Sequence, residues 1–424
     1  MICMRIALCL QSKDTLMWST EGLVGPENED WRVPVSELEE RQAKFSLSLS
    51  EHNINSAWIN DPVDMYWLVG NRQTGGVHIT SEGNVTQYVR SSLERAKFES
   101  GGNNSPHLIE QHPRMANLMS EVGQSPALQL GRMTANDAAF LQSKFGGKSK
   151  DCTTILWKLR EIKSSWEIDR MKESGEIQKQ MFEAINSFGI KNGEGISELE
   201  LAAVADGVSR SAGFGGMVRM RKWPMDCDRV VIASGTSGAI PSYFDSAIGG
   251  AGANPLASLG AGHKKIMKGE SILVDIVHVH RGYITDMTRM FSIGKPDEIW
   301  IERLEQMEEI ATNVKNSLSN GDTCSKAWEI GHSMSVNMGL SEHLMGMPPE
   351  QSRFLGHSIG LELDETPVVA SGFDAPLDIG GTMAIEPKVI FPEGAVGIED
   401  CWYRDEYGLQ CLSSGKSFPS WTEW

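Results

Sequence analysis

Four carboxylates lie in two apolar segments of the sequence, at spacings that could hold metal ions. The first segment reads SILVDIVHVHRGYITDMTRMFSI, and a hairpin turn at His280–Arg281 would place Asp275 directly opposite Asp286 on one side of the sheet. The second reads TMAIEPKVIFPEGAVGIEDCWY, and a turn at its PEG letters would place Glu386 opposite Glu399. The two hairpins therefore predict two pairs of facing carboxylates.

Such pairs need a compensating positive charge. Carboxylates that face each other on apolar strands repel, and in a low-dielectric site they stay ionised only beside a cation. Their four charges match two divalent ions, and His357, which follows a glycine between the two segments, adds a nitrogen ligand. An oxygen-rich set with one nitrogen suits Mn²⁺, Fe²⁺, Co²⁺ or Zn²⁺, with Mn²⁺ favoured here. Two such ions, about 3.5–4 Å apart, can share a bridging hydroxide and polarise a carbonyl. The alternative, acids on edge strands that face solvent, suits any single carboxylate better than all four.

The surrounding elements predict two domains after an extension. Residues 35–160 contain an amphipathic helix in ELEERQAKFSLSLSEHNI, a strand in INSAWIND and a hairpin in GVHITSEGNVTQYV, a pattern that predicts a small α/β domain. Ser164 before Glu167 is typical of the capped start of a long helix. Residues 161–424 then predict one α+β domain that holds both hairpins, whereas residues 1–34 show no clear period.

The composition restricts the partners. A net charge of −17 argues against nucleic acid and against an anionic membrane surface. No apolar run reaches the roughly 18 residues of a membrane span, and the start MICMRIALCLQSK lacks a convincing signal-peptide cleavage site. The seven cysteines are scattered, as for reduced thiols. These features predict a cytoplasmic protein.

The order of the motifs resembles that of one known family. Asp275 and Asp286 form a D-x10-D pattern that continues into T-R, His357 lies in G-H-x-I-G, Glu386 opens an E-P pair, and Glu399 lies in I-E-D. This order is similar to that of the "pita-bread" metallopeptidases of the M24 superfamily. The superfamily includes methionine aminopeptidases, Xaa-Pro aminopeptidases (aminopeptidase P), prolidases and creatinase.

The resemblance implies a fold, a metal site and an assembly. The fold is α+β, with a pita-bread catalytic domain preceded by a smaller α/β domain of the creatinase N-terminal type. The family commonly forms homodimers. The implied ligands of a dinuclear metal centre are Asp275, Asp286, His357, Glu386 and Glu399.

The sequence departs from the family pattern near the implied site. Ser242, Asp364 and Arg353 occupy places where Xaa-Pro peptidases carry histidines, and Gly397 occupies the place of a frequent arginine. An ionised carboxylate only accepts hydrogen bonds, so Asp364 suits a general base or an anchor for a cationic group better than an oxyanion donor. Arg353 could hold a substrate carboxylate. These residues are therefore candidates for catalysis, together with Glu386.

Three functions follow. The favoured one is a dinuclear metal-dependent hydrolase of the Xaa-Pro peptidase type, in which a bridging hydroxide attacks the amide carbonyl of a short peptide and Glu386 relays the proton. The second keeps the metals but acts as a lyase or C–N hydrolase on a small zwitterionic acid such as dimethylsulfoniopropionate, with Asp364 as the base. The third is a scaffold that binds without turnover, which the full ligand set disfavours.

Overall fold

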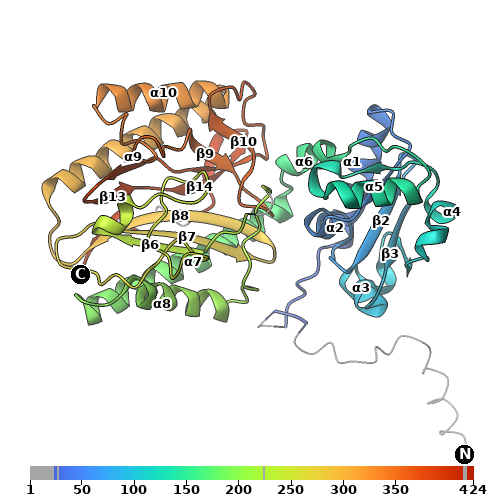
Figure 1. The fold of residues 1–424 in the computed structure, drawn as a ribbon, viewed down its shortest axis with the longest axis horizontal. Helices are drawn as coiled ribbons and strands as arrows, with labels where there is room; N and C mark the ends of the chain where they lie inside the picture. The colour runs from blue at the N-terminus through green and yellow to red at the C-terminus, as the bar shows by residue number, and fades with distance from the viewer. Residues whose placement is uncertain (1–22, 26–27, 223–224, 414–417) are drawn as a thin grey trace, which may run out of the picture. The chain divides into compact units, whose positions relative to one another are not determined.

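The computed structural model describes residues 23–25, 28–222, 225–413 and 418–424. The chain divides into two compact units, Met1–Leu156 and Trp157–Trp424, called here the N-terminal unit and the C-terminal unit (Figure 1). The division falls inside a helix, α6 (Thr153–Glu161). Most of the extension predicted before residue 35 lies outside the described residues.

The N-terminal unit is built on one five-stranded sheet. The strand order is β4-β3-β2-β1-β5, with β1 parallel to β5 and antiparallel to β2. The strands are β1 (Ser56–Ile59), β2 (Gly75–Thr80), β3 (Val85–Val89), β4 (Leu108–Gln111) and β5 (Ala127–Leu128). The helices before α6 are α1 (Val35–Glu51), α2 (Pro62–Val69), α3 (Leu93–Glu99), α4 (Leu118–Val122) and α5 (Ala135–Lys144).

Helices α1 and α2 show how this unit buries an apolar stripe and how its sequence can cap a helix. Helix α1 buries Leu38, Phe45 and Leu49, which lie on one face at helical spacing. Helix α2 starts because the Asp61 side chain accepts hydrogen bonds from the backbone N–H groups of the first turn and a proline occupies the first helical position. The predicted helix, strand and hairpin of this region are all present.

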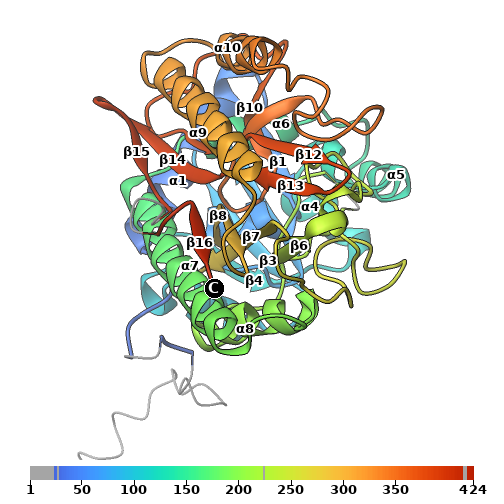
Figure 2. The same ribbon diagram turned by 90° about the vertical axis from the view of Figure 1, so that its left-hand side faces the viewer.

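The C-terminal unit has helices on the outer faces of its sheets. One sheet has the order β16-β8-β7-β6, a second has the order β10-β9-β11-β14-β15, and β12 and β13 form a separate pair. Figures 1 and 2 show α7 and α8 on one side of the β7–β8 strands and α9 and α10 on the other side of the unit. The strands outside the site are β6 (Val230–Ser234), β10 (Glu365–Ala370), β15 (Gly408–Cys411) and β16 (Trp421–Glu423), and the helices are α7 (Ser165–Asn192), α8 (Glu198–Ser211), α9 (Glu298–Ser319) and α10 (Cys324–Asn337).

The start of α7 agrees with its prediction. The Ser164 side chain accepts from the backbone N–H of Glu167, and the Glu167 side chain accepts from that of Ser164, which completes a capping box. The chain between the two hairpins forms two helices, α9 and α10. The second of them, α10, starts at a separate cap, where the Thr323 side chain accepts from Lys326 N.

Alternation along strand β7 (Ile272–His280) decides to which face of the sheet each side chain points. Ile272 and Val274 belong to the hydrophobic cluster with α7 and α8, whereas Leu273 belongs to the cluster with α9 and α10. Successive side chains of a strand point to opposite faces, so Asp275 shares the inner face with Leu273. Two clusters on opposite faces thus fix the direction in which the carboxylate points.

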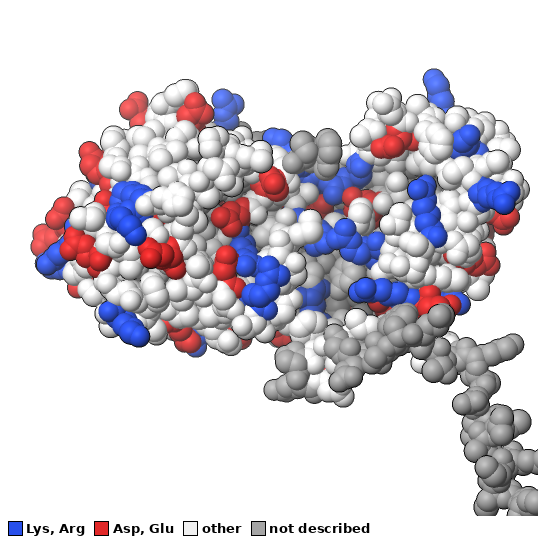
Figure 3. All heavy atoms as spheres, turned by 60° about the horizontal axis from the view of Figure 1, so that its bottom comes forward, with Lys and Arg blue, Asp and Glu red and all other residues white. Residues whose placement is uncertain are grey.

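The charged side chains and the hydropathy of the helices further characterise the described residues. On the face shown in Figure 3, basic and acidic side chains are both present on each unit. Among the described residues, no helix combines the length and apolar character needed to cross a membrane.

Candidate metal centre

The first carboxylate hairpin has a register that differs from the predicted one. Strand β7 pairs with β8 (Tyr283–Ser292) so that Asp275 lies opposite Thr288 and Asp286 lies opposite Val277. The prediction of direct opposition was wrong, because the turn is formed by Arg281–Gly282, both at positive φ, and lies one residue later than expected. A shift of the turn by one residue moves the opposing position by two, so Asp275 and Asp286 still share one face, diagonally.

The second hairpin has the predicted register. Strand β12 (Lys388–Phe391) pairs with β13 (Gly394–Gly397), and β11 (Thr382–Ile385) pairs with β14 (Asp400–Asp405). Glu386 and Glu399 lie between these two ladders, which share one register, so they remain opposite each other.

Two further strand contacts bring the hairpins and His357 together. Thr288 of β8 forms an isolated antiparallel bridge with Glu399, with backbone N–H···O distances of 3.3 and 3.4 Å. His357 of β9 (Phe354–Ser358) pairs with Ala384 of β11. Residues more than a hundred positions apart therefore meet at one point of the C-terminal unit.

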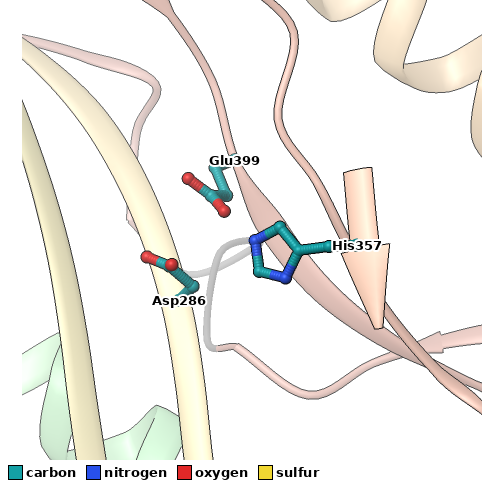
Figure 4. Close-up of side chains that lie close together, drawn as sticks. All are labelled: Asp286, His357 and Glu399. Atoms are coloured by element: carbon teal, nitrogen blue, oxygen red, sulfur yellow. The ribbon is translucent and has the colours of Figure 1, made fainter. Parts of the chain in front are cut away.

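Asp286, His357 and Glu399 form the central group of this site (Figure 4). Each offers one ligand atom, and these atoms all lie within 4.8 Å of one another. Within the described part of the chain, Asp286 Oδ1 and Glu399 Oε1 are buried and have no hydrogen-bond partner. Buried carboxylate oxygens without a donor are costly, so they indicate a place for a cation. Two oxygens and one nitrogen suit a divalent transition-metal ion.

A lysine that was not identified from the sequence lies beside this group. Lys388 Nζ is 2.7 Å from Glu386 Oε2, 2.7 Å from Glu399 Oε2 and 3.4 Å from Asp275 Oδ2. Its side chain is 1% exposed. The signal was present in the sequence, because residues two apart on an extended strand share a face and Lys388 follows Glu386 by two.

The electrostatics of the site are those of a cluster that is short of positive charge. Burial, and then the charges of Glu399 and Asp275, raise the pKa of Asp286 well above its usual range. Burial raises the pKa of Glu399, and although the charge of Lys388 opposes this effect, the pKa remains at about 8. A bound divalent ion would keep both carboxylates ionised.

On the other side of the cluster, cations and hydrogen bonds outweigh burial. Burial alone would raise the pKa of Glu386, but Lys388 and His357 lower it to about 2. Burial alone would lower the pKa of His357, but its contact with Glu386, 3.3 Å between Nε2 and Oε1, raises it to about 9. The residues therefore fit a divalent ion at Asp286, His357 and Glu399, whereas the oxygens near Lys388 already face an ammonium group.

A cavity of about 270 Å³ is lined by Asp275, Asp286, His357 and Glu386 of this cluster. Ligand sites commonly have volumes of roughly 300–1,000 Å³, so this cavity suits a small substrate. The lining of the cavity contains both acidic and apolar side chains. The acidic lining residues are Asp228, Asp245, Asp275, Asp286, Asp364 and Glu386, and the apolar ones include Val231, Phe244, Ile248, Leu259, Phe354 and Val368.

Two of the predicted catalytic residues do not line this cavity. The Ser242 hydroxyl accepts a hydrogen bond from Phe244 N at 3.3 Å. Arg353 is exposed and precedes the lining residue Phe354. The structure thus gathers the five predicted ligands and Asp364, and leaves Ser242 and Arg353 outside the lining.

Asp364 lines the cavity but has a structural task. Its two carboxylate oxygens accept hydrogen bonds from Arg221 N at 2.5 Å and from Lys222 N at 3.1 Å. Leu363 N donates in addition to Arg219 O at 2.8 Å. Asp364 therefore joins the loop after β9 to the segment around residue 221.

The rest of the acidic run in this loop belongs to a buried ion cluster. Glu362 and Glu365 are at most 1% exposed and contact the cations of Arg160, Lys163 and Arg221. These carboxylates face the cations and are not among the lining residues of the cavity. We call these five residues the buried ion cluster.

Comparison with known proteins identifies two sequence families. The pattern described as "Metallopeptidase family M24" matches residues 169–406, more than half of the chain, and the pattern described as "Creatinase/Prolidase N-terminal domain" matches residues 41–162. An Xaa-Pro dipeptidase of Pyrococcus furiosus is 24% identical over 380 residues, which cover 89% of this chain and 98% of that protein.

Solved structures share the fold. The dipeptidase PepE from Mycobacterium ulcerans superposes with a TM-score of 0.75 at 20% identity, covering 93% of this chain and all of that one. The prolidase from Pyrococcus horikoshii superposes with a TM-score of 0.71 at 23% identity, covering 88% and 98%. The predicted resemblance and the predicted fold class are confirmed by these comparisons.

Proposed function

Because the chain belongs to metallopeptidase family M24 and is thus a hydrolase of the peptidase class, we propose that it cleaves short Xaa-Pro peptides with a divalent metal ion. The relatives named Xaa-Pro dipeptidase and prolidase support this substrate class. The observation that carries the proposal is the group of Asp286, His357 and Glu399, which has two buried carboxylate oxygens without donors among the described residues and of which Asp286 and His357 line a small cavity. The non-peptidase alternative has no comparable support.

The residues of the site divide the catalytic tasks. A divalent ion, when bound by Asp286, His357 and Glu399, supplies Lewis-acid polarisation of the scissile carbonyl and activation of water. Glu386 lines the cavity next to His357 and is ionised at neutral pH, so it can accept the proton of the attacking water and pass it to the leaving nitrogen.

The lining of the cavity matches two chemical features of an Xaa-Pro dipeptide. The acidic lining residues attract the amino-terminal ammonium group of a peptide, and the apolar ones, which include Phe244 and Phe354, offer contact area for a prolyl ring. The ammonium group and the prolyl ring of an Xaa-Pro dipeptide therefore both find lining residues of matching chemistry. Three finer predictions are part of the same proposal: Mn²⁺ as the ion, a homodimer and a cytoplasmic location.

The proposed function is tested with peptides and a chelator. We expect the Mn²⁺-loaded protein to hydrolyse Gly-Pro or Ala-Pro, and EDTA to reduce the rate by at least about 100-fold, because metal-activated water is lost. Gly-Ala serves as the control without proline, and Gly-Pro-Ala distinguishes a dipeptidase from an aminopeptidase. Absence of Xaa-Pro cleavage with each of Mn²⁺, Fe²⁺, Co²⁺ and Zn²⁺ would contradict the proposal.

Replacing Asp364 by Asn separates the peptidase from the lyase alternative. We expect kcat/KM for Gly-Pro to stay within about tenfold of the wild type, because both Asp364 oxygens already accept backbone hydrogen bonds. The free energy of unfolding should fall by about 1–2 kcal/mol, since one charge-assisted acceptor is lost. A loss of more than about 100-fold in kcat/KM at unchanged stability would instead identify Asp364 as a catalytic base.

A further inference from the structure

Lys388 directs its ammonium group at three of the four carboxylates. An ammonium has three donors, and the three acceptors around Lys388 Nζ come from Glu386, Glu399 and Asp275, at 2.7, 2.7 and 3.4 Å. The nitrogen therefore occupies the space between both hairpins, where these oxygens converge.

The backbone around Lys388 is built to keep the side chain in this place. Gly397 lies directly opposite in the β12–β13 ladder, and a Cβ at Gly397 would overlap the Cβ and Cγ of Lys388. The carbonyl of Lys388 accepts a hydrogen bond from Met345 N at 2.8 Å. The lysine is thus fixed to a buried strand, and a glycine leaves the room it needs.

The opposite side of the cluster has unsatisfied acceptors. Asp286 Oδ1 and Glu399 Oε1 are buried and lack donors among the described residues, and both lie in the group completed by His357. The five predicted ligands are therefore not equivalent. Asp275 and Glu386 have the ammonium as a partner, whereas Asp286 and His357 offer a site for one ion.

We propose that Lys388 takes the place of one of the two cations, so that this centre holds a single divalent ion, bound by Asp286, His357 and Glu399. The inference rests on the proposed function in so far as it takes the centre to bind metal. A second divalent ion near Asp275 and Glu386 would share its ligand oxygens with the ammonium, and cations this close repel strongly in a water-poor site. The lysine is covalently attached and cannot leave, so the second ion is excluded.

Counting bound manganese tests the proposal without an activity assay. The full-length protein is dialysed against Mn²⁺, freed of loose ions and measured by inductively coupled plasma mass spectrometry and by electron paramagnetic resonance. We expect one Mn²⁺ per wild-type chain and the six-line spectrum of an isolated ion. Two Mn²⁺ per chain with an exchange-coupled spectrum would overturn the inference.

Three variants show whether Lys388 is the cause. Lys388→Ala removes both charge and bulk and should raise the count to two per chain with a coupled spectrum, whereas Lys388→Met removes the charge and keeps the length. Lys264→Met is the matched control, because Lys264 pairs with Glu270 and is not part of the centre, and it should keep one ion. Circular dichroism shows whether the Lys388→Ala variant folds. If the folded variant binds one ion, as the wild type does, the role of Lys388 is overturned.

The outcomes distinguish this inference from the proposed function. Two ions in an active wild-type peptidase would overturn the inference alone, and one ion in a protein that cleaves no Xaa-Pro peptide would overturn the function alone. If neither Lys388 variant folds, the ion count and the spectrum of the wild type decide between one site and two.

Discussion

Replacing Asp286 by Asn is expected to abolish metal binding and to lower kcat/KM for Gly-Pro by at least about 10³-fold. Asp286 supplies a buried oxygen that has no donor among the described residues, and it lies on the strand face that β7 and β8 turn toward the cavity. The variant loses one charge of the ligand set and keeps the shape. Metal content and steady-state kinetics measure both effects.

The fold of this variant should be preserved. Burial and neighbouring carboxylates disfavour the charge of Asp286 in the metal-free protein, so a neutral Asn should leave the free energy of unfolding equal or slightly higher. Asp400→Asn is the matched control, since the Asp400 carboxylate accepts from Arg289 and Ser413 and should not affect the ion. A fully metal-loaded Asp286→Asn variant would exclude Asp286 as a ligand.

Replacing Arg160 by Met should cost about 3–5 kcal/mol of the free energy of unfolding, the largest stability effect that we predict. Arg160 is 2% exposed, and its Nη2 lies 2.8 Å from Glu362 Oε2 and 2.5 Å from Glu365 Oε1. The variant leaves two buried carboxylates with one cation fewer, and urea unfolding measures the loss.

A surface pair on the same helix provides the control. Lys158 lies 2.6 Å from Glu161 with 65% of its side chain exposed, and Lys158→Met should change the free energy of unfolding by no more than about 1 kcal/mol. Equal losses in Arg160→Met and Lys158→Met would show that the buried ion cluster contributes no special stability.

The acid dependence of stability gives a second measurement on the buried ion cluster. Burial alone would raise the pKa of Glu365, but the charges of Lys163, Arg160 and Arg221 lower it well below its usual value. A carboxylate with a lowered pKa stabilises the fold fully above its unfolded pKa of about 4.3, and this stabilisation is lost as the pH falls further. The difference between the wild type and Arg160→Met should therefore shrink below about pH 4.

The sequence could predict the parts of the site that depend on local alternation. The register of the second hairpin follows from its PEG turn. Strand periodicity predicts that the side chains of Asp275 and Asp286 point to the same face of the sheet. The turn of the first hairpin was placed one residue early because a positive φ at Arg281, unlike that at Gly282, has no strong signal in the sequence.

The remaining errors concern partners that are distant in the chain. Glu362 and Glu365 belong to an acidic run beside His357, and their partners Arg160 and Lys163 lie about 200 positions earlier. Local spacing contains no information on such pairs. The sequence therefore does not show that Glu362 and Glu365 belong to the buried ion cluster whereas Asp364 lines the cavity. The place of Lys388 beside Glu386 follows from strand periodicity, but a lysine is not a typical metal ligand, so its type gives no sign of a role at a metal centre.

The buried ion cluster also bears on where the C-terminal unit begins. Arg160 and Lys163 lie at the end of α6 and just after it, and they neutralise the loop that carries Asp364. A shortened chain that starts at residue 161, the predicted domain boundary, would lack one of these cations, whereas one that starts at Trp157, where the compact unit begins, retains both. The pairing of these buried charges, more than the end of a helix, thus sets the shortest chain in which this cluster is complete.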